Sequence, residues 1–125
     1  MRALFAMMLL IGSSIGFAQD FQHQGRDDLA GGENGRAVES FAAAVNVNPF
    51  DAVALNNLAV ARAAQGNYQT ALMLLERAAR LAPDRKDIAD NLARFRSWLE
   101  GGGEKPFEVQ VGAAPPDLPP LWSKK

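Results

Sequence analysis

The chain has 125 residues, a formal net charge of −1 at pH 7, 48% hydrophobic residues and no cysteine. This length supports one modest domain and not two separate cores. The nearly balanced charge argues against nucleic-acid binding, which needs a clustered excess of lysine and arginine. Without cysteine there are no disulfides, no thiolate metal ligands and no lipid-attachment cysteine. The single histidine adds little, so we expect no enzyme, no catalytic residues, no cofactor and no metal site.

The first eighteen residues have the pattern of a secretory signal peptide. Arg2 supplies a positive start, an apolar run extends from Ala3 to Ile11, and Gly16 and Ala18 place small residues before Gln19. We therefore expect cleavage after Ala18 and a periplasmic or secreted protein, with no stable membrane span after cleavage. Retention as an anchor helix stays an alternative, although residues 3–18 fall short of the roughly 20 apolar residues of a membrane span.

A period of 34 residues runs through the middle of the chain. Shifting the sequence by 34 pairs glycine with glycine, proline with proline and small or apolar residues with their like. The pairs are Gly32 and Gly66, Ala37 and Ala71, Phe41 and Leu75, Ala44 and Ala78, Pro49 and Pro83, Ala54 and Ile88, Asn57 and Asn91, Leu58 and Leu92, and Ala59 and Ala93. Such a period indicates a stack of repeated supersecondary units.

The sequence of one repeated unit predicts two helices joined by a tight turn. Asp51 is a candidate N-cap for a helix that extends to about Gln65, and Gly66 can adopt the left-handed conformation that ends it. Asn67 can cap a second helix over residues 68–81, and Pro83 closes the unit. The preceding unit should have a shorter or looser first helix over residues 21–30. The following unit should have only its first helix, over about residues 85–99.

Residues 52–85 resemble a tetratricopeptide repeat. The residues that carry the resemblance are Leu55, Leu58, Ala59, Gly66, Tyr68, Ala71, Leu75, Ala78 and Pro83. The resemblance implies an all-α fold, namely a short helix–turn–helix solenoid of about two repeats, at residues 18–51 and 52–85, with a capping helix at 86–99. Residues 19–100 would form this domain, and residues 101–125 a flexible tail rich in proline and glycine.

The tail holds two candidate contact segments. Phe107 and Val109 belong to a stretch that alternates apolar and polar residues, as an exposed strand does. Leu118, Leu121 and Trp122 are apolar residues within a polyproline-like run. Either segment could dock on a partner or fold back into the groove of the repeats; the remaining alternative is a disordered terminus.

The resemblance also implies a concave groove, lined by the first helix of each unit, that binds a protein or peptide partner. By position, the lining residues would be Gln22, Arg26, Asn56, Asn57, Val60, Asp90, Asn91 and Arg94. Amide side chains suit recognition of a peptide backbone because each can donate and accept. Asn57 and Asn91 could instead bond one helix to the next. We thus expect an exported adaptor or scaffold of the cell envelope, for instance in pilus or secretion assembly; the alternative is a self-associating, homo-oligomeric module whose tail recruits the partner.

Overall fold

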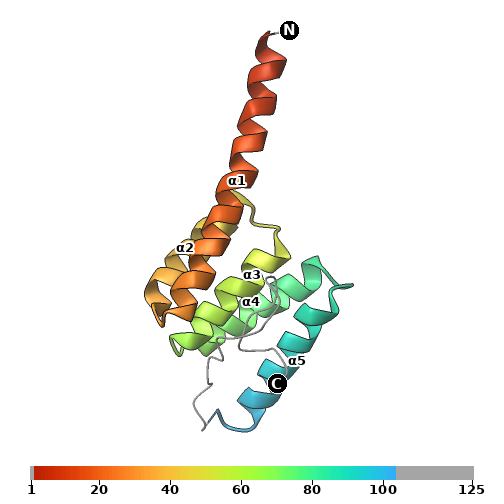
Figure 1. Cartoon of the computed structure of the whole chain (residues 1–125). Coiled ribbons are helices and arrows are strands. Elements are labelled where there is room, and N and C mark those ends of the chain that lie inside the picture. Colours follow the sequence, from red (N-terminus) through yellow and green to blue (C-terminus); the bar gives the residue numbers. More distant parts are fainter. Residues whose placement is uncertain (1, 104–125) are drawn as a thin grey trace.

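The computed structural model describes the backbone of residues 2–103 and the side chains of residues 16–103. Within this part the chain forms five helices and no strand: α1 (Arg2–Ala30), α2 (Asn34–Val47), α3 (Ala52–Ala64), α4 (Tyr68–Leu81) and α5 (Lys86–Glu100). Each helix packs on the next, so that α1, α3 and α5 are the first helices of successive units and α2 and α4 the second (Figure 1). The predicted all-α helix–turn–helix solenoid is confirmed. The predicted tail contacts lie outside the described residues.

The turns between paired helices repeat the same backbone geometry. Gly32 and Gly66 have φ values of 77° and 80°, in the left-handed region that glycine adopts without strain. After α1 the amide of Glu33 donates to the carbonyl of Asp28, and after α3 the amide of Asn67 donates to that of Arg62. These bonds are 34 residues apart and close the helix ends in the manner of a Schellman motif. The sequence period therefore corresponds to a structural period.

Side-chain N-caps were predicted for two helices, and the structure confirms one of them. The Asp51 carboxylate accepts hydrogen bonds from the amides of Val53 and Ala54, at 3.0 and 3.2 Å, and so caps α3 as expected. Asn67 stands at the N-cap of α4, but its side chain accepts no cap hydrogen bond, so that expectation is wrong. The backbone bond of Asn67 to Arg62 already fixes this turn.

The first helix is longer than the sequence predicted. It ends at Ala30 as expected, but it begins at Arg2, and its N-terminal part projects beyond the other helices (Figure 1). Within residues 16–103, no helix is long and apolar enough to cross a bilayer.

Gly25 is the reason why α1 and α2 pack closely. A Cβ at this position would lie 2.6 Å from Cε1 of Phe41, whose ring is almost completely buried. Gly25 is one repeat before Ala59, so it occupies the small-residue position of its unit, and its neighbour Gln24 bonds to Asp28 where other units have leucine. The prediction of a shorter or looser first helix is wrong, because glycine at this position allows the Phe41 ring to pack directly on α1.

We expect Gly25→Ala to lower the free energy of unfolding, although alanine is the better helix former. The propensity gain is about 1 kcal/mol, whereas forcing a methyl group into the Phe41 ring costs about 1–3 kcal/mol. Gly35→Ala is the matched control, because Gly35 lies in α2 with open space around its Cβ direction. Urea unfolding should show a loss for the first variant and a gain for the second; a gain for both would contradict the close packing.

Alanines let the helices of the second unit approach one another. Ala59, Ala71 and Ala78 are completely buried, together with Leu55 and Leu75. Larger side chains at the alanine positions would hold α3 and α4 apart. The core of this unit therefore combines small alanines with the buried leucines Leu55 and Leu75.

Aromatic side chains attach α5 to the preceding unit. The rings of Tyr68 and Trp98 meet edge to face, with centroids 4.8 Å apart, and Phe95 stacks on Trp98 at 5.7 Å. Tyr68 begins α4, directly after the turn that follows α3, and Trp98 lies near the end of α5. The C-terminal end of α5 thus lies beside the N-terminal end of α4.

Candidate functional site

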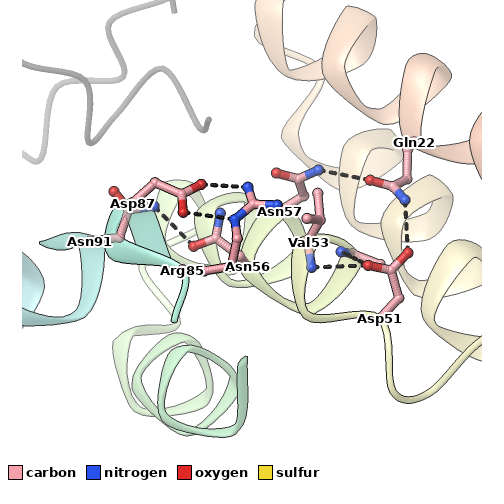
Figure 2. A network of polar contacts seen from close by, with 9 residues as sticks. Gln22, Asp51, Val53, Asn56, Asn57, Arg85, Asp87 and Asn91 are labelled. Atoms are coloured by element: carbon pink, nitrogen blue, oxygen red, sulfur yellow. Dashed lines mark hydrogen bonds and ion pairs between the residues drawn. The ribbon is translucent and has the colours of Figure 1, made fainter. Parts of the chain in front are cut away.

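The polar side chains that were predicted to line a groove come from α1, α3 and α5, and four of them form direct bonds. Gln22 of α1 bonds to Asn57 of α3, and Asn56 of α3 bonds to Asn91 of α5. Figure 2 shows these pairs in a row with Asp51 at one end and Arg85 and Asp87 at the other. The tertiary structure therefore brings together residues that are 35 positions apart in the sequence.

The two amide bonds are the same bond, one repeat apart. Asn57 donates its Nδ2 to Oε1 of Gln22 at 3.1 Å, and Asn91 donates its Nδ2 to Oδ1 of Asn56 at 3.0 Å. A shift of 34 residues converts the first pair into the second. Asn56, Asn57 and Asn91 are all buried. These asparagines therefore bond one unit to the next. For Asn57 and Asn91 this is the second of the two roles that the sequence suggested, a bond between helices.

The two bonds differ in what surrounds the acceptor amide. Gln22 also donates its Nε2 to Oδ2 of Asp51 at 3.2 Å, so both ends of its amide are satisfied. Asn56 is its counterpart in the next unit, and its Nδ2 is buried without a hydrogen-bond partner. The residue that corresponds to Asp51 is Arg85, which can donate but cannot accept. We call Gln22, Asn57, Asn56 and Asn91 the amide row. Within this row, Nδ2 of Asn56 is the one buried donor without a hydrogen-bond acceptor.

Arg85 and Asp87 form a bidentate pair at the start of α5. Arg85 donates its Nε and one terminal nitrogen to the two carboxylate oxygens of Asp87, at 2.8 and 2.6 Å. This pairing favours the ionised carboxylate. The hydrogen bonds from Arg85, reinforced by its charge and opposed by partial burial, hold the pKa of Asp87 below its usual value.

We expect the Asp87 pair to contribute stability that acid removes. Because the pKa of Asp87 is lower in the folded state, its contribution is present above its ordinary pKa of 3.8 and is lost as the pH falls through the folded value. Asp87→Asn should therefore flatten the dependence of the free energy of unfolding on pH below about pH 4. Urea unfolding over that pH range measures this. Arg85→Gln should flatten it in the same way; an unchanged slope in both variants would contradict the assignment.

The other residues that were predicted to line the groove lie either beside the bonded amides or in the hydrophobic core. Arg26 of α1 is half-buried and bonds to Nδ1 of the exposed His23 at 3.0 Å. Asp90 of α5 accepts a hydrogen bond from Lys86 at 2.8 Å, and Arg94 is exposed. Val60 is completely buried. Charged side chains thus flank the amide row on both sides.

The described side chains offer no metal-binding cluster: within residues 16–103, no group of three or more His, Asp or Glu residues is placed to hold a metal ion. The arrangement bonds helices to one another, and the charges that flank it can pair with groups of a partner. It brings together no nucleophile and base.

Sequence reasoning missed two parts of this row. Asp51 was expected to cap α3, and it does, but its second oxygen also holds Gln22. The pairing of Arg85 with Asp87 was not foreseen. The sequence did contain a relevant pattern: a shift of 34 residues aligns Asp51 with Arg85. An acidic residue in one unit is thus replaced by a basic residue in the next, which indicates different polar contacts at this position.

Comparison with known proteins gives one partial similarity. No protein-family model matches the chain. Over 60 residues, or 48% of this chain, it is 42% identical to a protein named Protein O-mannosyl-transferase TMTC1 from mouse (Mus musculus), and it spans 6% of the length of that relative. Together with the five stacked helices, this similarity supports a tetratricopeptide-like repeat fold.

Proposed function

We propose that the chain is a protein-interaction module that captures a protein or peptide partner along the groove bordered by α1, α3 and α5. The observation that carries the proposal is the pair of arginines on the two sides of the buried amides: Arg94 of α5 is exposed and Arg26 of α1 is half-buried. Arg26 and Arg94 lie at the two rims, where they can pair with acidic groups of a partner. The helical-repeat fold favours a scaffold over an enzyme. The activity in the mouse protein's name does not weigh against this, because the present chain matches only 6% of the length of that protein.

The compartment is part of the proposal. The signal-like start of the sequence supports export with cleavage after Ala18, and with it a role as an adaptor of the cell envelope, such as in pilus or secretion assembly. In α1, Gln22 and Asp28 hold the other helices, and both follow Gln19. Cleavage there would leave these bonds intact. The intact mass of the protein isolated from its native host tests this: a mass that retains residues 1–18 would contradict cleavage.

Affinity capture from an envelope extract tests the groove. The immobilised chain should retain a partner that the double variant Arg26→Glu, Arg94→Glu loses. Arg80→Glu is the matched control, because Arg80 is an exposed arginine of α4 in the other helical layer. Equal capture by all three would mean that the groove is not the binding surface.

A second candidate function is self-association, and exposed apolar side chains favour it. Val47 and Leu81 end α2 and α4 at equivalent repeat positions, and Phe50, in the turn after α2, is 73% exposed. Such residues on one edge suit contact with a second copy. Sedimentation should show mass that rises with concentration and that Phe50→Ser lowers; a constant monomer mass would exclude this candidate.

A further inference from the structure

Helix α5 lies at the end of the array opposite α1 (Figure 1). The first helix of each preceding unit has a second helix packed on it, α2 on α1 and α4 on α3. Among the described residues α5 packs closely on α4, and no second helix of its own unit follows it. One long face of α5 is therefore left without a helical neighbour in the described part of the chain.

The repeat period identifies this face. Gly25, Ala59 and Ala93 occupy the same position in successive units. In α1 this position lies against an aromatic ring of α2, and in α3 it is completely buried, whereas in α5 it is exposed. Ala89 is likewise exposed, although its counterpart Leu55 is completely buried. The face that is covered in the first two units thus faces solvent in α5.

This face of α5 has small residues near its centre and charged residues toward its ends. Residues three, four and seven positions apart lie on one side of a helix. The exposed residues of α5 at this spacing, which we call the α5 seam, are Lys86, Ala89, Ala93, Arg96, Ser97 and Glu100. Ala93 allows another helix to approach closely, because its side chain is a single methyl group. The charged residues then decide which neighbour fits.

The charges along this face are complementary to themselves in the antiparallel direction. Lys86 and Glu100 each lie seven residues from Ala93, on opposite sides of it, and Asp90 and Arg96 each lie three residues from it. When two antiparallel copies of α5 cross at Ala93, residues equally far from it on opposite sides lie at the same level. A basic residue then meets an acidic residue in both pairs. In a parallel pair each charge would lie level with its own copy and be repelled.

We propose that the α5 seam is a dimer interface, at which the α5 helices of two copies of this chain pack antiparallel about a two-fold axis at Ala93. A two-fold contact is self-complementary and closes the assembly at a dimer. It uses a side of α5 other than the one that bears Asn91, and it does not involve the edge around Phe50, so it goes beyond both functions proposed above. Because α5 has 15 residues and is about 22 Å long, one helix pair gives a small interface and a weak dimer.

The charged groups of this interface also bond within the chain, and they stay accessible to solvent. Lys86 bonds to Asp90 at 2.8 Å, and Arg96 bonds to Glu76 at 2.9 Å. The side chains of Lys86, Asp90 and Arg96 are nonetheless 85%, 47% and 51% exposed. A carboxylate has about four acceptor sites and a guanidinium about five donors, so each can also contact a second copy.

The absence of cysteine allows a direct test on the full chain. A residue on a two-fold axis meets its own copy, so Ala93→Cys should give a disulfide-linked dimer under a mild oxidant. Ala89→Cys is the matched control: the two copies of residue 89 are offset along the helices by about 12 Å, beyond the roughly 4.4–6.8 Å between Cα atoms that a disulfide spans. A mixture of Ala89→Cys and Ser97→Cys chains should cross-link, because these residues lie level. Equal cross-linking of Ala93→Cys and Ala89→Cys would overturn the proposal.

Sedimentation measures the same contact without a cross-link. In a Phe50→Ser background, which removes the other apolar edge, the mass should rise with concentration to that of a dimer and no further. Adding Glu100→Lys should weaken this dimer about tenfold, because each copy then sets a lysine level with Lys86 of the other. Adding Lys86→Glu as well should restore it. A constant monomer mass in this background, or a dimer that Glu100→Lys leaves unchanged, would overturn the proposal, and neither result would bear on the groove.

Discussion

Asn57→Asp is expected to destabilise the domain strongly, by about 3 kcal/mol or more, because it buries a carboxylate against an oxygen. Asn57 is 4% exposed, and its Nδ2 donates to Oε1 of Gln22. Aspartate has the same shape but cannot donate when ionised. Gln22 cannot turn its amide over to compensate, because its Nε2 already donates to the Asp51 carboxylate.

Asn91→Asp is the matched comparison and should cost less, because the new carboxylate can gain a hydrogen-bond donor that a carboxylate at position 57 lacks. Asn91 is 2% exposed and makes the equivalent bond one repeat later. Its partner Asn56 has an unmet Nδ2, so turning its amide over presents a donor to the new carboxylate. Urea unfolding at neutral pH measures both variants. A cost for Asn91→Asp that equals or exceeds that of Asn57→Asp would contradict the assigned orientation of the amides.

Ala71→Leu and Ala78→Leu should each cost about 1–3 kcal/mol of unfolding free energy through overpacking. Both alanines are completely buried on the face of α4 that meets its neighbours. Leucine is nearly as good a helix former as alanine, so the loss would reflect packing and not propensity. Thermal unfolding measures the effect. Met73→Leu is the control, because Met73 lies on the same helix and is mostly exposed. Unchanged stability in both alanine variants would exclude this packing register.

Much of the fold could be predicted from the sequence because it depends on local interactions that the 34-residue period repeats. Gly66 ends α3 with a positive φ, Asp51 begins it with a side-chain cap, and α4 runs over residues 68–81 as expected. Gly25 shows the limit of pattern matching. Its role depends on the Phe41 ring, which comes from another helix.

For the candidate site, the sequence by itself determined which residues share the groove side of the first helices, because helical spacing and the repeat period fix their positions. Only the tertiary structure decided how they are used. A bond between residues 22 and 57, or 56 and 91, depends on the distance between successive units, which packing sets. The same holds for burial: Asn56 and Val60 are enclosed because helices pack around α3, and no local pattern encodes that enclosure. Local hydrogen bonds and side-chain period thus fixed the elements, while the long-range packing of one unit on another made the amide row and left one donor in it unmet.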